Sequence, residues 1–330
     1  MRIYSSAIFS VLLLGSGLLY ADTAQTGALT LQRGGGAKAE GLGQSFVSIP
    51  GQIQSLGYNP AGLSHLPYAE VSATYLNGMV DDSLGTLTYG QPVPFGTLFV
   101  GALYFDGGSI DLNLSSGLQE QRNAQQDIVG MVGFGLGRNI PLSIGVTGKL
   151  FRLELAETVN ESGYALDSGL LWKTPLKNFN LGGSAQNIGP DVKFEQDSDP
   201  LPLTYRFGAS YSLDLGQFRA FRWIPIEFLL TSDGVKQKEE DLASHSGLEI
   251  KRNIETENMN GSAAFRIGYI SDPQTVNVGV GANLSGFSID YAISLFDELD
   301  ETHRVTLSYY FLRKDTFDPS RLKKRTLSQE

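Results

Sequence analysis

Large apolar residues alternate with small or polar residues from about Glu70 almost to the end of the chain. Alternation with a period of two residues predicts β-strands, because successive side chains of a strand point to opposite faces. We identify about fourteen strands, each close to the length of about 9–11 residues that a tilted membrane-spanning strand needs. They are centred near Tyr75, Thr88, Gly101, Val132, Val146, Gly169, Gly183, Ala209, Phe228, Gly247, Ile267, Val278, Tyr291 and Leu307.

The two faces of these strands differ in an informative way. Between residues 275 and 282, one face carries Val276, Val278, Val280 and Ala282, and the other carries Thr275, Asn277, Gly279 and Gly281. A soluble sandwich would place the large residues inside and show charged residues to water. The second face here is mostly Gly, Ser, Ala and Thr, which suits the crowded lumen of a barrel better. The pattern therefore predicts an all-β fold, a transmembrane antiparallel β-barrel of about 14 strands.

The composition is compatible with this prediction. Glycine supplies 39 of 330 residues and charged residues only 18%, above and below their usual levels of about 7% and about 25%. No apolar run of about 18 residues follows the first 21 residues, so the sequence offers no membrane helix there. A soluble, secreted all-β protein is the alternative that composition leaves open. The net charge of -10 argues against nucleic acid as a partner, and the absence of cysteine excludes disulfides and lipid attachment to cysteine.

The chain divides into four segments. Residues 1–21 resemble a signal peptide, with Arg2 before a short apolar run and Ala21 as the last leader residue, an uncleaved anchor helix being the alternative. Residues 22–68 form a glycine-rich segment, a small N-terminal plug expected in the barrel lumen, and residues 69–312 form the transmembrane barrel. Residues 313–330 are expected to be a polar periplasmic tail with a solvated basic cluster, Arg321, Lys323, Lys324 and Arg325.

An even number of strands places both ends of the barrel chain on one side, the periplasm. Turns on that side should be short, as at residues 138–141, 174–177 and 285–286. Loops on the other side should be longer, as at residues 107–126, 189–202 and 233–241. Two connections depart from this rule. Residues 270–274 are short where a long loop is expected, and residues 252–261 are long where a short turn is expected. The strand count is therefore uncertain by two.

The glycine-rich segment contains two motifs that resemble the PorV/PorQ-type outer-membrane proteins of the FadL-like barrel superfamily. The first is a Gly/Ala pattern ending in Phe, and the second is Asn-Pro-Ala-Gly, in which Asn can cap a helix and Pro suits its first position. The matching residues are Gly36, Ala37, Ala39, Gly41, Gly43, Phe46, Asn59, Pro60, Ala61 and Gly62. The resemblance implies an outer-membrane barrel of fourteen strands with an N-terminal hatch in the lumen.

The resemblance leaves more than one function open. PorV-type members serve type IX secretion, so secreted proteins or secretion-system subunits would be partners. FadL-type members admit hydrophobic molecules such as long-chain fatty acids, but this chain is short and has no long apolar loop that could capture them. We therefore expect a non-enzymatic secretion accessory first, a hydrophobic channel second and a structural surface anchor third. In each case outer-membrane lipid surrounds the protein.

Strand alternation directs several charged residues inward. They are Lys149, Asp167, Arg206, Glu227, Glu249, Arg266 and Asp290. They could form a polar passage, but opposite charges that pair across the lumen and hold the plug are the favoured interpretation, because an unpaired charge in a narrow lumen is costly. Arg206 and Arg266 are expected to bind plug carbonyls. Aromatic residues near strand ends are expected in the interfacial girdles: Trp172, Trp223, Tyr269, Tyr309 and Phe311.

Catalysis and metal binding find little support. The chain has three histidines, His65, His245 and His303, without metal-ligand spacing. His245 is expected to face the lumen, whereas Ser244 and Ser246 on the same strand point the other way. No Ser-His pair is therefore supported within that strand, and a partner on an adjacent strand is the alternative left open. No Walker-type phosphate loop is present. Taken together, these observations lead us to expect no enzyme activity, no cofactor and no metal.

Overall fold

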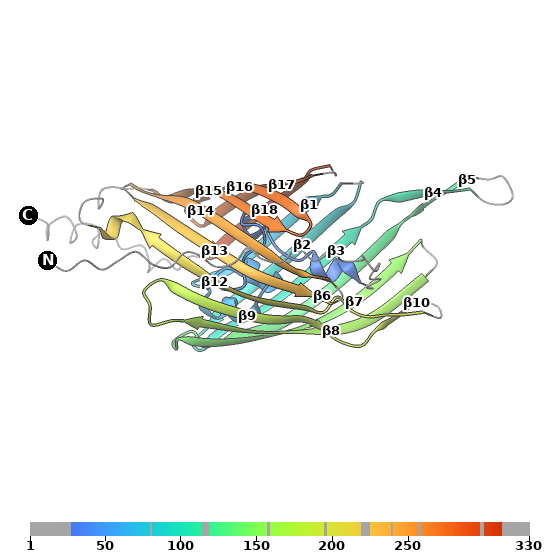
Figure 1. Ribbon diagram of the computed structural model, residues 1–330, viewed down its shortest axis with the longest axis horizontal. Helices are drawn as coiled ribbons and strands as arrows, with labels where there is room; N and C mark the ends of the chain where they lie inside the picture. The colour runs from blue at the N-terminus through green and yellow to red at the C-terminus, as the bar shows by residue number, and fades with distance from the viewer. Residues whose placement is uncertain are drawn as a thin grey trace, which may run out of the picture.

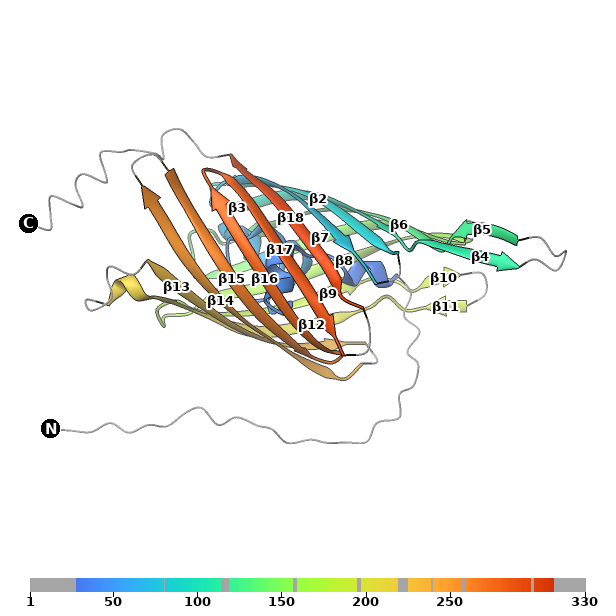
Figure 2. The ribbon, with the colours of Figure 1, turned by 90° about the horizontal axis from the view of Figure 1, so that it is seen from above.

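In the computed structural model, fourteen strands close into one antiparallel barrel (Figures 1 and 2). The structure describes residues 28–311 except 80, 114–118, 157–158, 195–196, 219–224, 239, 257–258 and 298–299. The segments expected to form a signal peptide and a polar tail, residues 1–21 and 313–330, lie outside the described residues, as does Trp223. None of the helices in the described part of the chain is long and apolar enough to cross a membrane.

The predicted strand centres all fall within barrel strands. The first seven are β1 (Ala69–Asn77), β2 (Ser83–Val93), β3 (Gly96–Asp106), β6 (Gln125–Leu136), β7 (Leu142–Leu155), β8 (Val159–Lys173) and β9 (Phe179–Ile188). The other seven are β12 (Thr204–Asp214), β13 (Ile226–Gln237), β14 (Leu242–Thr256), β15 (Met259–Ser271), β16 (Gln274–Leu284), β17 (Phe287–Phe296) and β18 (Thr302–Phe311). Pairing of β1 with β18, from Ala69 opposite Phe311 to Asn77 opposite His303, closes the barrel.

The two ends of the barrel differ. We call the end where β1 begins and β18 ends the terminal end, and the opposite end the hairpin end. Two small hairpins extend the hairpin end, β4 (Ser109–Asn113) with β5 (Gln119–Asn123) and β10 (Val192–Phe194) with β11 (Asp197–Asp199) (Figure 2). The long loops predicted at residues 107–126 and 189–202 therefore contain paired strands.

Two loop predictions were wrong. Residues 252–256 and 259–261 continue strands β14 and β15, so the connection at the terminal end is short, as the barrel rule requires. Residues 233–237 likewise belong to β13, which shortens the loop expected over residues 233–241. Both segments are rich in polar residues, and the sequence pattern could not distinguish a polar strand end from a loop.

The faces of the barrel are inverted relative to those of a soluble protein. Val276, Val280 and Leu295 are exposed on the outside, whereas Asn277 and Ser294 are buried inside. Large exposed apolar residues occur all around the wall, including Leu150 at 72%. Trp172, Tyr269, Tyr309 and Phe311 are also exposed. An apolar outer wall around a polar interior is the arrangement that a lipid bilayer favours.

The N-terminal segment, residues 28–66, lies inside the barrel (Figures 1 and 2). It contains the 3-10 helices η1 (Leu29–Gln32), η2 (Ile53–Gly57) and η3 (Pro60–His65) and the short α-helix α1 (Ala37–Gly41). Helix α1 contacts β15–β18, and η3 contacts β3 and β6–β8 on the opposite wall. The segment thus crosses the lumen from one wall to the other.

Apolar clusters hold the segment. Phe46 packs with Leu42, Ile49 and Tyr58, its ring centroid 5.7 Å from that of Tyr58. A second cluster joins segment residues to Phe99 of β3. A third cluster joins Ala28 and Leu31 to inward-facing residues at the hairpin end, Leu76, Leu84, Leu103, Phe105, Val129, Phe151, Leu153, Ala165, Val192 and Leu201.

Candidate functional site: the polar interface between the N-terminal segment and the barrel wall

Asn59 joins the segment to itself and to the wall. Its side-chain Oδ1 accepts a hydrogen bond from Ala61 N at 3.0 Å and so caps η3, which begins at Pro60. Its Nδ2 donates to Val47 O at 2.6 Å and to Leu170 O of β8 at 2.9 Å. The side chain is fully buried. One asparagine thereby satisfies a helix start, a segment carbonyl and a wall carbonyl.

The Gly/Ala motif lies directly against the wall. Gly36 precedes α1 in an extended conformation, and Ala37 N donates to Thr306 Oγ1 of β18 at 2.8 Å. Ala39 is buried, and the Cα of Gly41 lies beside Gly279 of β16. Small residues are needed here because the backbone of α1 touches strand backbone.

After α1, the chain turns against β13 and β14. Gly43 has a φ of 63° and its carbonyl contacts His245 Nδ1 at 2.8 Å. The backbone N–H groups of Phe46 and Val47 both donate to Asp233 Oδ2, at 2.7 and 2.9 Å. A buried carboxylate that accepts two backbone hydrogen bonds fixes this bend.

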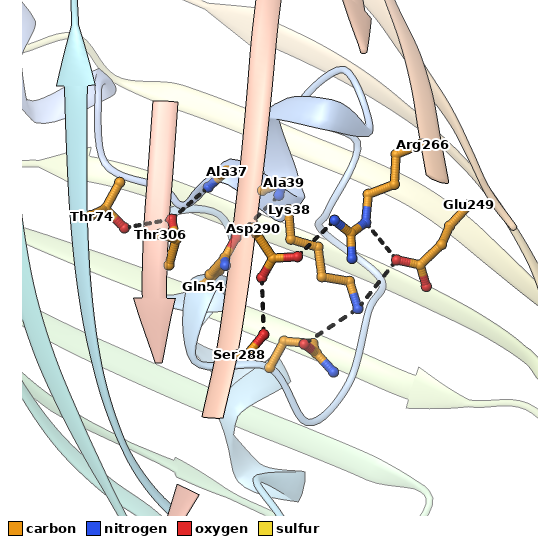
Figure 3. Close-up of polar contacts among 11 residues, drawn as sticks. Ala37, Lys38, Ala39, Gln54, Thr74, Glu249, Arg266, Ser288, Asp290 and Thr306 are labelled. Carbon is orange, nitrogen blue, oxygen red and sulfur yellow. Dashed lines mark hydrogen bonds and ion pairs between the residues drawn. The ribbon is translucent and has the colours of Figure 1, made fainter. Parts of the chain in front are cut away.

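A buried ionic cluster connects α1 to three strands (Figure 3). Arg266 Nε donates to Glu249 Oε2 at 2.6 Å, and Arg266 Nη1 donates to Asp290 Oδ1 at 2.7 Å. Lys38 of α1 completes the cluster, its Nζ 3.6 Å from Glu249 Oε2 and 3.4 Å from Gln52 Oε1. Burial lowers the pKa of Lys38, while the Glu249 carboxylate opposes that shift.

The other predicted lumen charges are also paired or hydrogen-bonded. Lys149 Nζ lies 2.8 Å from Asp167 Oδ2 and donates to Asn187 Oδ1 at 2.7 Å. Glu227 lies near the terminal end, is less buried than the others and pairs with Lys251 at 2.6 Å. The seven residues therefore form several separate groups instead of one continuous track.

Arg206 and Arg266 were expected to bind carbonyls of the N-terminal segment, but both donate to side chains of the barrel wall. Arg266 donates to two wall carboxylates, and Arg206 donates from Nε to Gln186 Oε1 at 3.0 Å while its guanidinium lies 5.1 Å from the ring centroid of Tyr58. Segment carbonyls are instead bound by Arg304, through Gly35 O at 3.0 Å, and by Arg138, through Leu66 O at 2.9 Å. Which arginine binds a segment carbonyl depends on how the segment lies against the wall, which the sequence did not supply.

Sequence reasoning missed several residues of this interface: Lys38, Glu40, Asp127, Asp233 and Arg304. Strand alternation could have identified Asp233 and Arg304 as inward-facing. Asp233 shares a strand face with Thr231 and Val235, and Arg304 shares one with Thr306; all of these residues are buried. Glu40 had no such signal. It pairs with Arg304 at 3.4 Å and accepts from Ser294 at 2.9 Å, contacts that only the folded segment creates.

Among the described residues, one polar cavity lies on each side of the segment. The terminal-end cavity, about 150 Å³, is lined by Lys38, Glu70, Lys251, Arg266 and Asp290, among others. The hairpin-end cavity, about 240 Å³, is lined by segment residues from Leu31 to Tyr58 and by residues of β9 and β12–β18. Burial raises the pKa of Tyr58 in its wall, which keeps the phenol neutral. No group of three or more His, Cys, Asp or Glu residues in the described ranges is arranged to hold a metal.

A closed antiparallel barrel with an apolar outer wall and a filled polar lumen defines an outer-membrane β-barrel protein, as the sequence predicted. Residues 151–309 match the family model described as type IX secretion system membrane protein PorP/SprF. No curated protein gives a significant sequence match.

Solved structures match in fold. The P. putida toluene transporter TodX is 12% identical with a TM-score of 0.57, over 86% of this chain and 100% of that one. A TodX deltaS2S3 mutant, described as a monoaromatic hydrocarbon channel, is 14% identical with a TM-score of 0.54, over 84% of this chain and 98% of that one. At these identities the similarity concerns the fold alone.

Proposed function

We propose that the protein is a non-enzymatic accessory of type IX protein secretion at the outer membrane. The observation that carries the proposal is the match of residues 151–309 to the PorP/SprF family. The match spans β strands from β7 to β18, more than half of the barrel wall. The motifs that resemble PorV/PorQ proteins lie in residues 36–62, outside the matched range, so they support the same process from a second part of the chain.

We propose further that residues 22–68 act as the plug of this barrel, after removal of residues 1–21 as a signal peptide, and that residues 313–330 form the periplasmic tail. The plug assignment is supported by the contacts of residues 28–66 with both walls. A barrel filled in this way would serve as a docking platform for exported proteins, with its two hairpins as the most prominent features at the hairpin end.

Photo-crosslinking in living cells tests the secretion role. A photoreactive residue at Gln121 of β5, which is exposed, should capture secreted proteins or secretion-system subunits, identified by mass spectrometry. The matched control is Val132, 64% exposed on the outer wall, where the same probe should capture lipid. Capture of lipid alone at both positions would contradict the proposal.

A channel for hydrophobic molecules is the second candidate, favoured by the fold similarity to TodX. The polar lining of both cavities does not suit an apolar solute. Deletion of the gene distinguishes the candidates. Loss of particular proteins from the medium with normal uptake of hydrophobic molecules supports secretion, and the reverse supports a channel. A surface anchor would show neither phenotype but would bind a partner through its hairpin end.

A further inference from the structure

The hairpin-end cavity is lined by two buried arginines, each of which has one guanidinium nitrogen without a hydrogen-bond partner. Its volume of about 240 Å³ could hold several water molecules or a small solute. Its lining includes Asp272 and Pro273 of the β15–β16 connection, both of which are exposed. The cavity therefore reaches the surface at the hairpin end.

Arg206 lines this cavity and is only 8% exposed. Its Nε is bound to Gln186, but its Nη1 is buried and has no hydrogen-bond partner. Within the described part of the chain, no carboxylate forms an ion pair with it. Leaving a guanidinium nitrogen buried and unpaired is costly, since charged groups lose hydration when they are buried.

Arg304 lines the same cavity from β18 and is 6% exposed. Its Nη1 and Nη2 are engaged by Gly35 O and Glu40, but its Nε is also buried without a hydrogen-bond partner. Two arginines, one on β12 and one on β18, thus line the same cavity, and each has one guanidinium nitrogen without a hydrogen-bond partner. The phenol of Tyr58 and the imidazole of His245 add polar surface between them.

We propose that the hairpin-end cavity binds a small hydrophilic oxyanion, a carboxylate or a phosphate, with Arg206 as its main ligand. Guanidinium groups bind both oxyanions through parallel N–H bonds, which would satisfy the unused donor. Arg304 supplies a second donor, while its bond to Gly35 connects the site to the N-terminal segment. The site does not depend on the secretion role.

Calorimetric titration of the purified full-length protein in detergent, at constant ionic strength, tests the proposal. Succinate and inorganic phosphate are the probes, and their relative affinities identify the preferred oxyanion. Arg206→Gln should weaken binding of the preferred probe by about tenfold or more, because a hydrogen bond to a charged group is lost. Lys251→Gln is the control, since it removes one positive charge from the terminal-end cavity and should leave the affinity unchanged.

A second variant covers the case in which Arg206→Gln does not fold. Ile270 is buried in the wall of the same cavity, and Ile270→Trp would fill the space while retaining both arginines. It should abolish binding of the preferred probe. The proposal is overturned if the wild-type protein binds neither anion, or if either folded variant binds with wild-type affinity.

Discussion

At the scale of single residues, the fully buried Asn59 is the position where the N-terminal segment depends most on one side chain. Asn59→Ala would remove the cap of η3 and leave Val47 O and Leu170 O without their side-chain donor. Losing a cap and removing the side-chain donor of two carbonyls, one of them buried, should lower the free energy of unfolding by about 2–4 kcal/mol.

Urea unfolding in detergent measures this change. Asn139→Ala is the matched control, because Asn139 is exposed and donates to Pro94 O at 3.1 Å. Its removal should cost no more than about 0.5 kcal/mol. Equal stability of Asn59→Ala and the control would show that the Asn59 contacts contribute little.

His65 at the end of η3 should make stability depend on pH. Burial, with Lys173 and Arg138 nearby, lowers the pKa of His65 to about 4, whereas an unfolded histidine titrates near about 6.5. The fold therefore favours the neutral imidazole, whose Nε2 contacts Ser143 Oγ at 3.0 Å. This contribution is fully present above about pH 6.5 and is lost as the pH falls from about 6.5 through 4.

His65→Gln should flatten that part of the stability profile, because glutamine does not titrate. Thermal unfolding midpoints of the wild type and the variant, measured between about pH 4 and 7.5, give the comparison. His303→Gln serves as a control, since His303 is partly exposed on β18. A wild-type profile that His65→Gln leaves unchanged would exclude this role.

At the scale of elements, the strands accommodate the N-terminal segment through glycine. A Cβ added to any of five inward-facing strand glycines would overlap the segment: Gly145, Gly169, Gly182, Gly247 and Gly268. At Gly268 the overlap would be with backbone atoms of Leu42 and Gly43, which cannot rotate away. Glycine is therefore needed in this chain for close packing of the wall against the segment as well as for turns.

Gly268→Val should therefore loosen the segment without opening the barrel. We expect a loss of about 1–3 kcal/mol, typical of overpacking, and faster tryptic cleavage after Lys38, whose side chain is only 15% exposed in the wild type. Gly85→Val is the control, because a Cβ at Gly85 meets no atom within 4 Å. Cleavage rates that are the same in both variants would argue against close packing between α1 and the wall.

At the scale of the whole molecule, the outer wall should behave as a lipid-facing surface. Leu150 is 72% exposed on β7, and Leu150→Arg should destabilise the membrane-inserted barrel by about 2–4 kcal/mol, since a charge near the bilayer midplane is costly. Leu176→Arg is the control, because Leu176 is 68% exposed but lies in the β8–β9 turn.

Folding into lipid vesicles, followed by the mobility of the unheated protein on a gel, measures the difference. The same pair tested in detergent should differ less, because a micelle adapts to a charge more readily than a bilayer. A tolerated Leu150→Arg in vesicles would place β7 outside the hydrocarbon region.

Much of the fold follows from local sequence. Period-two alternation is a property of neighbouring residues, so it located fourteen strands and the orientation of Val276 or Asp290 without knowledge of any partner. The inverted chemistry of the two faces, apolar outside and small or polar inside, followed from the same pattern and predicted the outer membrane. The Asn-Pro signal likewise marked the start of η3, because capping involves residues close in sequence.

The tertiary structure decided the contacts inside the lumen. Arg266 binds Glu249 and Asp290, which are 17 and 24 residues away, and Asp233 binds backbone groups 186 and 187 residues away. Such partners depend on strand order, tilt and register, which together set the height of each side chain in the barrel. The sequence by itself therefore determined the barrel and its orientation of faces. Only closure of the barrel around the N-terminal segment determined which charges are paired and which nitrogens of Arg206 and Arg304 have no partner among the described residues.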